Sequence, residues 1–429
     1  MRPLIFIGLL LCLGYSVLAF GGTQPVLFAP AQLGAFLLFA LLLWDRNSTK
    51  LLPWKGPALL LSYVAFQSLT LGADLFLVQE HLLQFLSYLC FFFLAVQLGQ
   101  SRRLRYRLVL ALLGLGLLET LYGMVQYLSG WQQIFTYQKI FYTDQATGTY
   151  INANHFAGFL EMVLPLSLAL ALYRLGAGSA IGPAPPPERR SSSGQEGLAP
   201  AFFFFFVSVV LFLGIFFSHS RMGIFSSLAA VVAMGILWMS VSLHRLLATL
   251  VLATFLLGAG AMGIWVGVEP VVERYAAAES DYLLRSAIWA DTASLIREHP
   301  LWGTGLGTFV TVYPQVQTTA LNYVVEHAHN DYLEVATELG IPGAVLLFGL
   351  ILTVLWRAVS VFYSSPRQRD RFLLLGCCGS ILAILLHSFT DFNLQIPANA
   401  IVFAVVLGLT YGVSGENDSP RYPLPAPPA

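Results

Sequence analysis

Residues 341–362 read IPGAVLLFGLILTVLWRAVSVF, a run in which Arg357 is the only charged residue. A helix needs about 20 mainly apolar residues to cross a bilayer, so this run predicts a membrane span. Eleven further runs meet the same test, and we expect the first to remain as an uncleaved helix. The twelve predicted spans lie near 3–20, 25–44, 56–72, 81–99, 106–129, 152–173, 201–218, 222–240, 246–267, 341–362, 373–390 and 396–413.

The composition supports a membrane protein. The 429 residues are 57% hydrophobic and only 10% charged, whereas soluble proteins carry roughly 25% charged residues. A soluble enzyme of this length is therefore excluded, and an all-α, polytopic integral membrane protein is predicted. The net charge is zero, and no basic patch indicates nucleic-acid binding. The four cysteines lie inside apolar runs, which is typical of small buried residues.

The distribution of basic residues predicts the topology. With a cytoplasmic N-terminus, 17 of the 22 Lys and Arg residues fall on the inside and five on the outside. The positive-inside rule expects such an excess, and both termini are then cytoplasmic.

The spans group into regions. We expect N-terminal membrane helices over 1–140 and middle membrane helices over 141–267. We also expect a periplasmic catalytic loop over 268–340, C-terminal membrane helices over 341–414 and a disordered cytoplasmic tail over 415–429. Residues 176–200 are rich in Gly, Pro and Ser and predict a flexible cytoplasmic linker.

The outside loop is predicted to be structured. A helix capped by Ser280-Asp281 would end at His299-Pro300, and residues 303–308 would form a turn. A second helix is expected to begin near His329 and to continue toward the tenth span. Seven of the eight histidines map to the outside under this topology, which directs the search for chemistry to that face.

Two arginines on the predicted outside can each be interpreted in two ways. Arg221 lies in a short turn between two spans, and Arg285 lies on the expected loop helix. Either side chain could simply reach toward water. Alternatively, the two form a cationic pocket, because guanidinium groups suit phosphate oxygens.

The densest polar cluster, Glu326–Glu334, reads EHAHNDYLE and is followed by GIPG at 340–343. His327 and His329 could bind a metal, but residues two apart do not share a helix face. The cluster could be an ordinary polar loop, or one histidine could be a general base. Glycines at 340 and 343 favour close backbone approach at the entry to the span.

Some polar residues lie within spans. Glu119 and Glu161 could belong to a proton or ion path, or could be buried and hydrogen-bonded. Asn152, Asn154 and the run from His387 to Asp391 share this property.

Several of these motifs resemble one family. His329-Asn330, nine residues, and Gly340-Ile-Pro-Gly343 match the His-Asn-x9-Gly-x-x-Gly signature of the O-antigen ligase and O-antigen polymerase superfamily. These proteins are integral-membrane glycosyltransferases and include protein O-oligosaccharyltransferases. The resemblance covers roughly 145–405. Its further motifs are Gly148–His155, Ser220-Arg221, Arg285-x-x-Ile-Trp289 with His299–Gly303, and His387…Asp391-Phe…Pro397-Ala-Asn399.

The resemblance implies a GT-C-like fold in the bacterial inner (cytoplasmic) membrane, with its active site on the periplasmic face. It implies a glycan donor on undecaprenyl diphosphate, transfer with inversion, and no metal or other cofactor. His329 would be the catalytic base, with His327 as the alternative, and Arg221 and Arg285 would hold the diphosphate. The other expected substrate-binding residues are Asn330, Asn154, His155, His327, His387 and Asp391.

The acceptor stays open at this stage. A lipid A–core saccharide would make the protein a ligase involved in lipopolysaccharide biosynthesis. A second polysaccharide chain would make it a polymerase, and a Ser or Thr side chain a protein O-oligosaccharyltransferase. A different class, a transporter of lipid-linked glycans, would use Glu119, Glu161 and the outer arginines as a conduit. Transporters often contain inverted repeats, and no internal repeat is visible.

Overall fold

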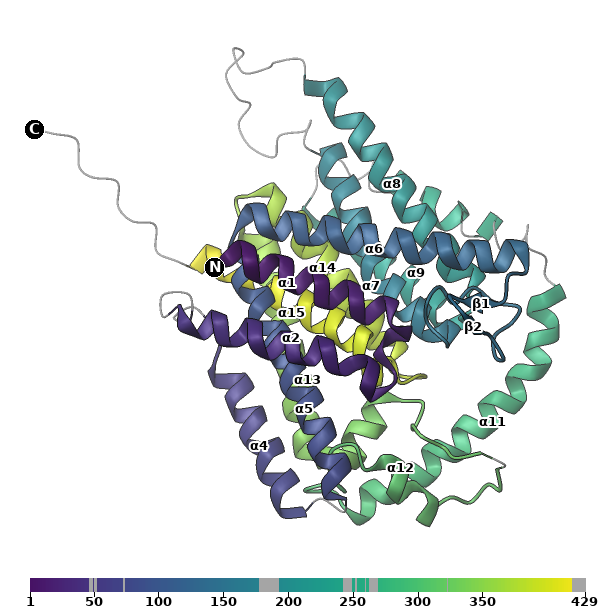
Figure 1. The fold of residues 1–429 in the computed structure, drawn as a ribbon. Coiled ribbons are helices and arrows are strands. Elements are labelled where there is room, and N and C mark those ends of the chain that lie inside the picture. The colour runs from purple at the N-terminus through teal and green to yellow at the C-terminus, as the bar shows by residue number, and fades with distance from the viewer. Residues whose placement is uncertain are drawn as a thin grey trace, which may run out of the picture.

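The computed structural model describes the chain except for residues 46–48, 50–51, 72–73, 177–192, 242–248, 251–252, 259, 262–268, 322 and 419–429. The described part is almost entirely helical (Figure 1). The long helices are α1 (Arg2–Leu18), α2 (Pro25–Trp44), α4 (Lys55–Leu71), α5 (Leu75–Gly99), α6 (Arg102–Ser129), α7 (Ala153–Gly176), α8 (Ser193–Phe217), α9 (Arg221–Val241), α11 (Glu269–Glu298), α13 (Asp331–Ser364), α14 (Gln368–His387) and α15 (Pro397–Asp418). The short elements are η1 (Phe20–Gly22), β1 (Gln133–Ile134), β2 (Tyr137–Gln138), α12 (Phe309–Val312), η3 (Tyr313–Gln315) and η4 (Asn393–Gln395).

The predicted fold class is confirmed, whereas the count of twelve spans is not. Nine of the described helices are long and apolar enough to cross a membrane. The predicted spans 3–20 and 56–72 form the helices α1 and α4, which have only 17 residues each. The predicted span 246–267 lies largely outside the described residues.

Several predicted boundaries were wrong. The loop helix does not begin at Ser280-Asp281, because α11 already contains Glu269; its end before His299-Pro300 is as expected. Residues 193–200 belong to α8 and not to a linker, and α15 continues into the predicted tail as far as Asp418. In both places the helix of the neighbouring span extends into polar sequence that composition alone assigns to a loop.

Helix α7 forms the centre of the bundle. Nearly all of its residues are buried, and it contacts α8, α9, α14 and α15. Small residues allow the closest packing between helices, as is common inside membranes. On α15, a Cβ at Gly408 would lie 2.3 Å from the Phe92 carbonyl oxygen of α5, and one at Gly412 would lie 2.5 Å from that of Val96. This Gly-xxx-Gly pair therefore allows the backbones of α5 and α15 to lie in direct contact.

Helix α13 turns sharply at Gly340, where φ is 70° and ψ is 170°. The turn frees carbonyl groups at 337–339 that a straight helix would use internally. The Thr304 and Gly305 N–H groups donate to Thr337 and Glu338, and the Tyr63 hydroxyl of α4 donates to Leu339 at 2.7 Å. We call this set of contacts between 300–305 and 337–341 the backbone clasp. It confirms the predicted close approach, since a Cβ at Gly340 would lie 2.5 Å from the Leu301 carbonyl oxygen.

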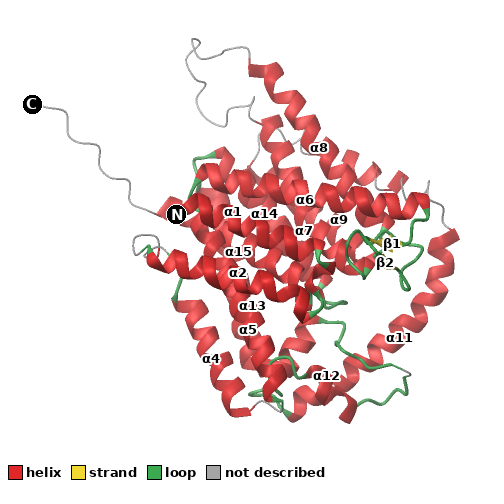
Figure 2. Ribbon diagram, in the orientation of Figure 1, coloured by secondary structure: helices red, strands yellow, loops and turns green. Residues whose placement is uncertain are grey.

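The segment between α11 and α13 has its own small core. Ile288 on α11 packs with Phe309, Tyr313, Val325 and Ala328. The buried Asp291 carboxylate accepts hydrogen bonds from the Tyr313 hydroxyl and from the Thr318 N–H and hydroxyl. Figure 2 shows the loops of this segment in green beside α11 and α12. The predicted structured loop, with its turn at 303–308, is therefore present.

Candidate active site

The site lies where several helix ends meet. Helices α7, α9, α13 and α15 begin at this end of the bundle, and α14 ends there at His387. The segment 388–396, which joins α14 to α15, passes through the middle of these ends. Its Ser388 carbonyl accepts the Asp331 N–H, and its Leu394 N–H donates to the Asp331 carboxylate at 3.2 Å. The site is therefore assembled from segments far apart in the sequence.

His329 stands just before α13 in a strained backbone conformation, with φ at 50°. Asn330 caps the helix, because its side-chain oxygen accepts the Leu333 N–H at 3.0 Å. His329 Nδ1 lies 3.6 Å from Asp391 Oδ1, within ion-pair distance but longer than a hydrogen bond. Nδ1 is buried while 33% of the side chain is exposed, so the ring presents its other edge, with Nε2, to the open side.

Asp391 lies between His329 and an arginine. Its carboxylate is buried and accepts the Phe392 N–H at 2.9 Å. Burial favours the neutral acid, but His329 and the Arg285 guanidinium outweigh burial and hold the pKa of Asp391 well below its usual range. Arg285 also donates to the neighbouring carbonyl of Thr390. The structure thus brings Arg285, Asp391 and His329 together, although they lie on three separate segments.

His327 is held differently from His329. Its Nδ1 lies 2.8 Å from the Glu334 carboxylate, which also accepts the Ala328 N–H. Burial lowers the pKa of His327, but the carboxylates of Glu334, Glu338 and Glu326 outweigh burial and raise it above its ordinary value. The two histidines therefore differ in geometry: His327 makes a hydrogen bond to its carboxylate, whereas His329 Nδ1 stands 3.6 Å from its own.

Three histidine rings pack against Phe392. The His327 ring is stacked on Phe392 at 4.2 Å between centroids, and the rings of His155 and His329 meet it edge-on at 4.7 and 4.9 Å. His155 is buried on the first turn of α7, next to the half-buried Asn154. Among the described residues, no hydrogen-bond partner lies within reach of His155 Nε2.

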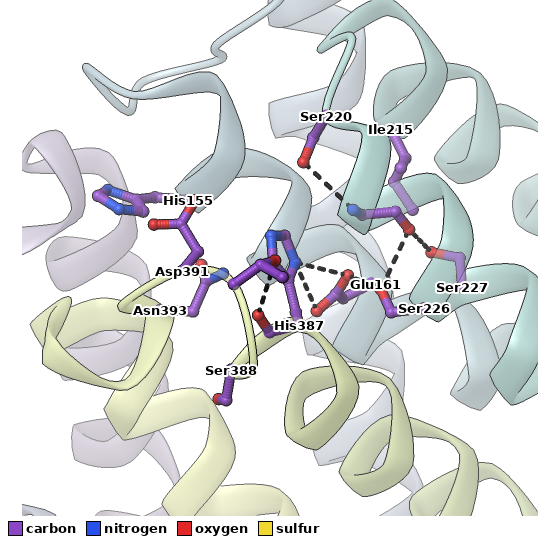
Figure 3. A network of polar contacts seen from close by, with 12 residues as sticks. His155, Glu161, Ile215, Ser220, Ser226, Ser227, His387, Ser388, Asp391 and Asn393 are labelled. Carbon is purple, nitrogen blue, oxygen red and sulfur yellow. Dashed lines mark hydrogen bonds and ion pairs between the residues drawn. The ribbon is translucent and has the colours of Figure 1, made fainter. Parts of the chain in front are cut away.

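A buried polar network lies under this cluster (Figure 3). His387 Nδ1 lies 3.0 Å from the Glu161 carboxylate of α7, and Ser226 of α9 donates to the same carboxylate at 2.5 Å. Arg221 is the first residue of α9 and is exposed, so its helix reaches the network about one and a half turns later. The structure therefore places Arg221 on the helix that supplies Ser226 to the network, five residues before that serine.

Sequence reasoning missed part of the site. Asp331, Glu334 and Glu338 are all buried on one face of α13, at the helical spacing i, i+3 and i+7. That spacing was available from the sequence. Asn399 donates to the His155 carbonyl and to the Asn393 side-chain oxygen; the resemblance included this asparagine, but it was not among the predicted site residues. Glu119 instead accepts the Thr149 N–H and hydroxyl at 2.8 Å each, which matches the hydrogen-bonded reading of that residue.

The fold and site define a multi-pass membrane protein with a buried-acid and histidine site at one end of its helices. Among the described residues, no group of His, Cys, Asp and Glu could hold a metal ion. Residues 206–348 match the family model of O-antigen ligase. The match includes Arg221, Arg285, His327, His329 and Asn330. Over this segment the chain is similar to that family, which supports the resemblance to the O-antigen ligase and polymerase superfamily. No curated protein matches the chain.

Proposed function

We propose that this protein transfers a glycan from undecaprenyl diphosphate to an acceptor hydroxyl on the periplasmic face of the inner membrane. Lipid A–core is the acceptor that we favour. The observation that carries the proposal is the convergence of His329, Asp391 and Arg285 within and beside the segment that matches the O-antigen ligase family.

His329 acts as the general base. Asp391 faces Nδ1 and stabilises the imidazolium that forms, which leaves Nε2 to take the acceptor proton. The acceptor oxygen then forms a bond to the anomeric carbon as the bond from that carbon to the diphosphate breaks. The electron pair of the broken bond leaves with the diphosphate. Attack from the face opposite the leaving group inverts the anomeric carbon, and no step requires a metal.

Arg285 and Arg221 neutralise the leaving diphosphate. Guanidinium groups bind phosphate oxygens through paired N–H donors and stabilise negative charge as it develops. Arg221 adds its charge at the start of α9, where the helix dipole also favours an anion. Asn330, Asn154, His155 and His387 line or support the same region and belong to the proposed substrate-binding set.

Purified protein in vesicles, lipid-linked glycan and a panel of acceptors test this function. The panel contains lipid A–core, a second glycan chain and a Ser/Thr peptide, which separates ligase, polymerase and protein O-oligosaccharyltransferase. We expect transfer to be lost in His329→Ala and retained in part in His327→Ala. Movement of glycan across the membrane without a new glycosidic bond would instead establish the transporter alternative.

The side of the membrane needs its own measurement. Single cysteines placed at exposed positions of the loop, such as Tyr323→Cys, should react with an impermeant reagent in intact spheroplasts. The four native cysteines are buried or half-buried. They are removed from the background, and the labelling of this cysteine-free protein is the reference for each single-cysteine variant. Labelling only after lysis would place the site on the cytoplasmic face and overturn the proposed function.

A further inference from the structure

The helix ends opposite the candidate active site carry several arginines. Helix α7 ends there, and α6 and α14 begin there. The buried Arg105 guanidinium of α6 pairs with the Asp370 carboxylate of α14 and donates to the Gly99 carbonyl at 3.2 Å. This buried ion pair fixes the start of α6 against the start of α14.

Two further arginines at this end share a pair of tyrosine rings. The Arg369 guanidinium of α14 lies 5.3 Å from the centre of the Tyr106 ring and 5.8 Å from that of Tyr173. Arg174 of α7 donates to the Tyr106 hydroxyl at 3.4 Å and lies 6.0 Å from the centre of the Tyr173 ring. Contacts with ring faces hold a guanidinium in place and leave most of its N–H donors for another partner. We call these four residues the arginine–tyrosine cluster.

The charge of the arginine–tyrosine cluster is not balanced within the described part of the chain. The neighbouring carboxylate, Asp370, is buried and is shared by Arg105 and Arg367, the latter at 3.7 Å. Among the described residues, no carboxylate forms an ion pair with Arg174 or Arg369. Two guanidinium groups held on the same rings repel each other unless an anion lies between them. The arrangement therefore favours an anionic ligand, and guanidinium donors suit phosphate oxygens.

The surface of α6 next to the cluster is apolar and exposed. Beyond Tyr106, the exposed residues include Leu110, Leu118 and Leu121, and a Cβ at Gly114 would meet nothing within 4 Å. These positions follow each other at three or four residues, so they form one stripe along the helix. From Tyr106 to Leu121 the stripe is ~22 Å long, which exceeds half of the ~30 Å hydrocarbon core. An acyl chain whose head group binds the cluster can therefore lie along α6.

We infer that the arginine–tyrosine cluster binds the phosphate of an anionic phospholipid. A lipid is favoured over a soluble anion because the cluster continues into the exposed apolar stripe of α6. Under the predicted topology this end faces the cytoplasm, and basic pockets between helices on that side bind acidic head groups. The bound lipid neutralises the two like charges and joins α6, α7 and α14. The inference is independent of the proposed function, because it concerns the opposite end of the helices.

Native mass spectrometry of the full-length protein, stripped of lipid in a neutral detergent, measures the preference directly. The probes are phosphatidylglycerol and phosphatidylcholine with the same acyl chains. Both carry a phosphate, but only phosphatidylglycerol has a net negative charge. We expect phosphatidylglycerol to be retained at least about tenfold better and to raise the thermal unfolding midpoint, since it binds the folded state alone. Equal retention of the two lipids would overturn the inference.

Inorganic phosphate separates a lipid site from a site for a soluble anion. It is added in large excess to the stripped protein and to the protein loaded with phosphatidylglycerol. We expect it to leave the unfolding midpoint of the stripped protein unchanged and to displace little of the bound lipid. A midpoint raised by inorganic phosphate as much as by phosphatidylglycerol, together with loss of the lipid, would show a site for free anions and overturn the assignment to a lipid.

Matched variants locate the site. Because one basic residue near an acidic lipid surface contributes roughly fivefold in affinity, Arg174→Gln and Arg369→Gln should each weaken retention of phosphatidylglycerol about fivefold, and the double variant about 30-fold. Arg297→Gln, at an exposed position of α11 outside the cluster, changes the net charge equally and should stay within about twofold of wild type. Equal losses in Arg297→Gln and in the two cluster variants would contradict the inference. The comparison of the two lipids on the wild-type protein stands even if the double variant does not fold.

Discussion

Replacing Asp391 by Asn tests the chemistry of the site most directly. The two side chains have nearly the same shape, and the amide oxygen can still accept the Phe392 N–H that now lies 2.9 Å from Oδ1. The change removes the negative charge that faces His329 Nδ1 at 3.6 Å. The fold should therefore survive, while the imidazolium that forms during transfer loses its stabilising partner.

The distance sets the size of the effect. Two unit charges 3.6 Å apart interact by about 4–5 kcal/mol at an effective dielectric constant of about 20. Because 33% of the His329 side chain is exposed, water weakens this interaction. We expect transfer to slow by about 10²–10³-fold, within the ~10²–10⁴-fold contribution of a positioned base.

The assay is the initial rate of transfer at saturating donor and acceptor, together with the thermal unfolding midpoint in detergent. The control is Asp370→Asn, because Asp370 is also buried but pairs with Arg105 between α6 and α14, at the other end of α14. Asp370→Asn should lower the unfolding midpoint and leave the rate per folded molecule unchanged. A rate for Asp391→Asn within threefold of wild type would refute the reasoning.

Three further predictions concern the same region. The pKa of His327 is raised in the fold, so its pairing with Glu334 stabilises the protein fully below the unfolded pKa of ~6.5. This stabilisation is lost as pH rises through the raised pKa; the unfolding midpoint should fall over that window, and Glu334→Gln should flatten the fall. Gly340→Ala should lower the midpoint strongly, since φ is 70° and a Cβ would lie 2.5 Å from a carbonyl oxygen, whereas Gly349→Ala on the same helix meets nothing within 4 Å and should stabilise by about 0.5–1 kcal/mol; similar midpoints for the two variants would contradict this account. Arg285→Lys keeps the charge but loses the paired donors, so the KM for the donor should rise about tenfold while the KM for the acceptor stays constant in steady-state kinetics; an unchanged donor KM would remove Arg285 from the diphosphate site.

Hydrophobic run length predicted the membrane fold well, because a bilayer leaves few alternatives to apolar helices. It did not predict where α8, α11 and α15 begin or end. Those boundaries depend on tertiary contacts and on helix propagation into polar sequence, which run length does not contain. The Gly340 turn was expected from its glycine, but its partners at 300–305 could not be, because they lie more than 30 residues away.

The site was predicted in part. His329 follows from a local sequence motif, and Arg285 follows from a charge on the side that the topology prediction places outside. The contact of both with Asp391 is a product of folding, since these residues lie on separate segments. The acidic face of α13, in contrast, could have been predicted from the sequence. Glu334 and Glu338 are four residues apart, the spacing that places two side chains on one face of a helix, but they were not among the predicted site residues.

The backbone clasp between 300–305 and 337–341 also bears on how this chain can change in length. Because main-chain N–H and C=O groups make most of its contacts, the spacing of residues across the clasp is fixed whatever side chains surround it. Insertions or deletions inside α13 or within 300–305 would break that register. The exposed stretch around Tyr323 and Val324 lies between the clasp and His327 and is not part of it. Surface loops accept extra residues at little cost, so the chain can change in length at this stretch without shifting the residues on either side of the clasp.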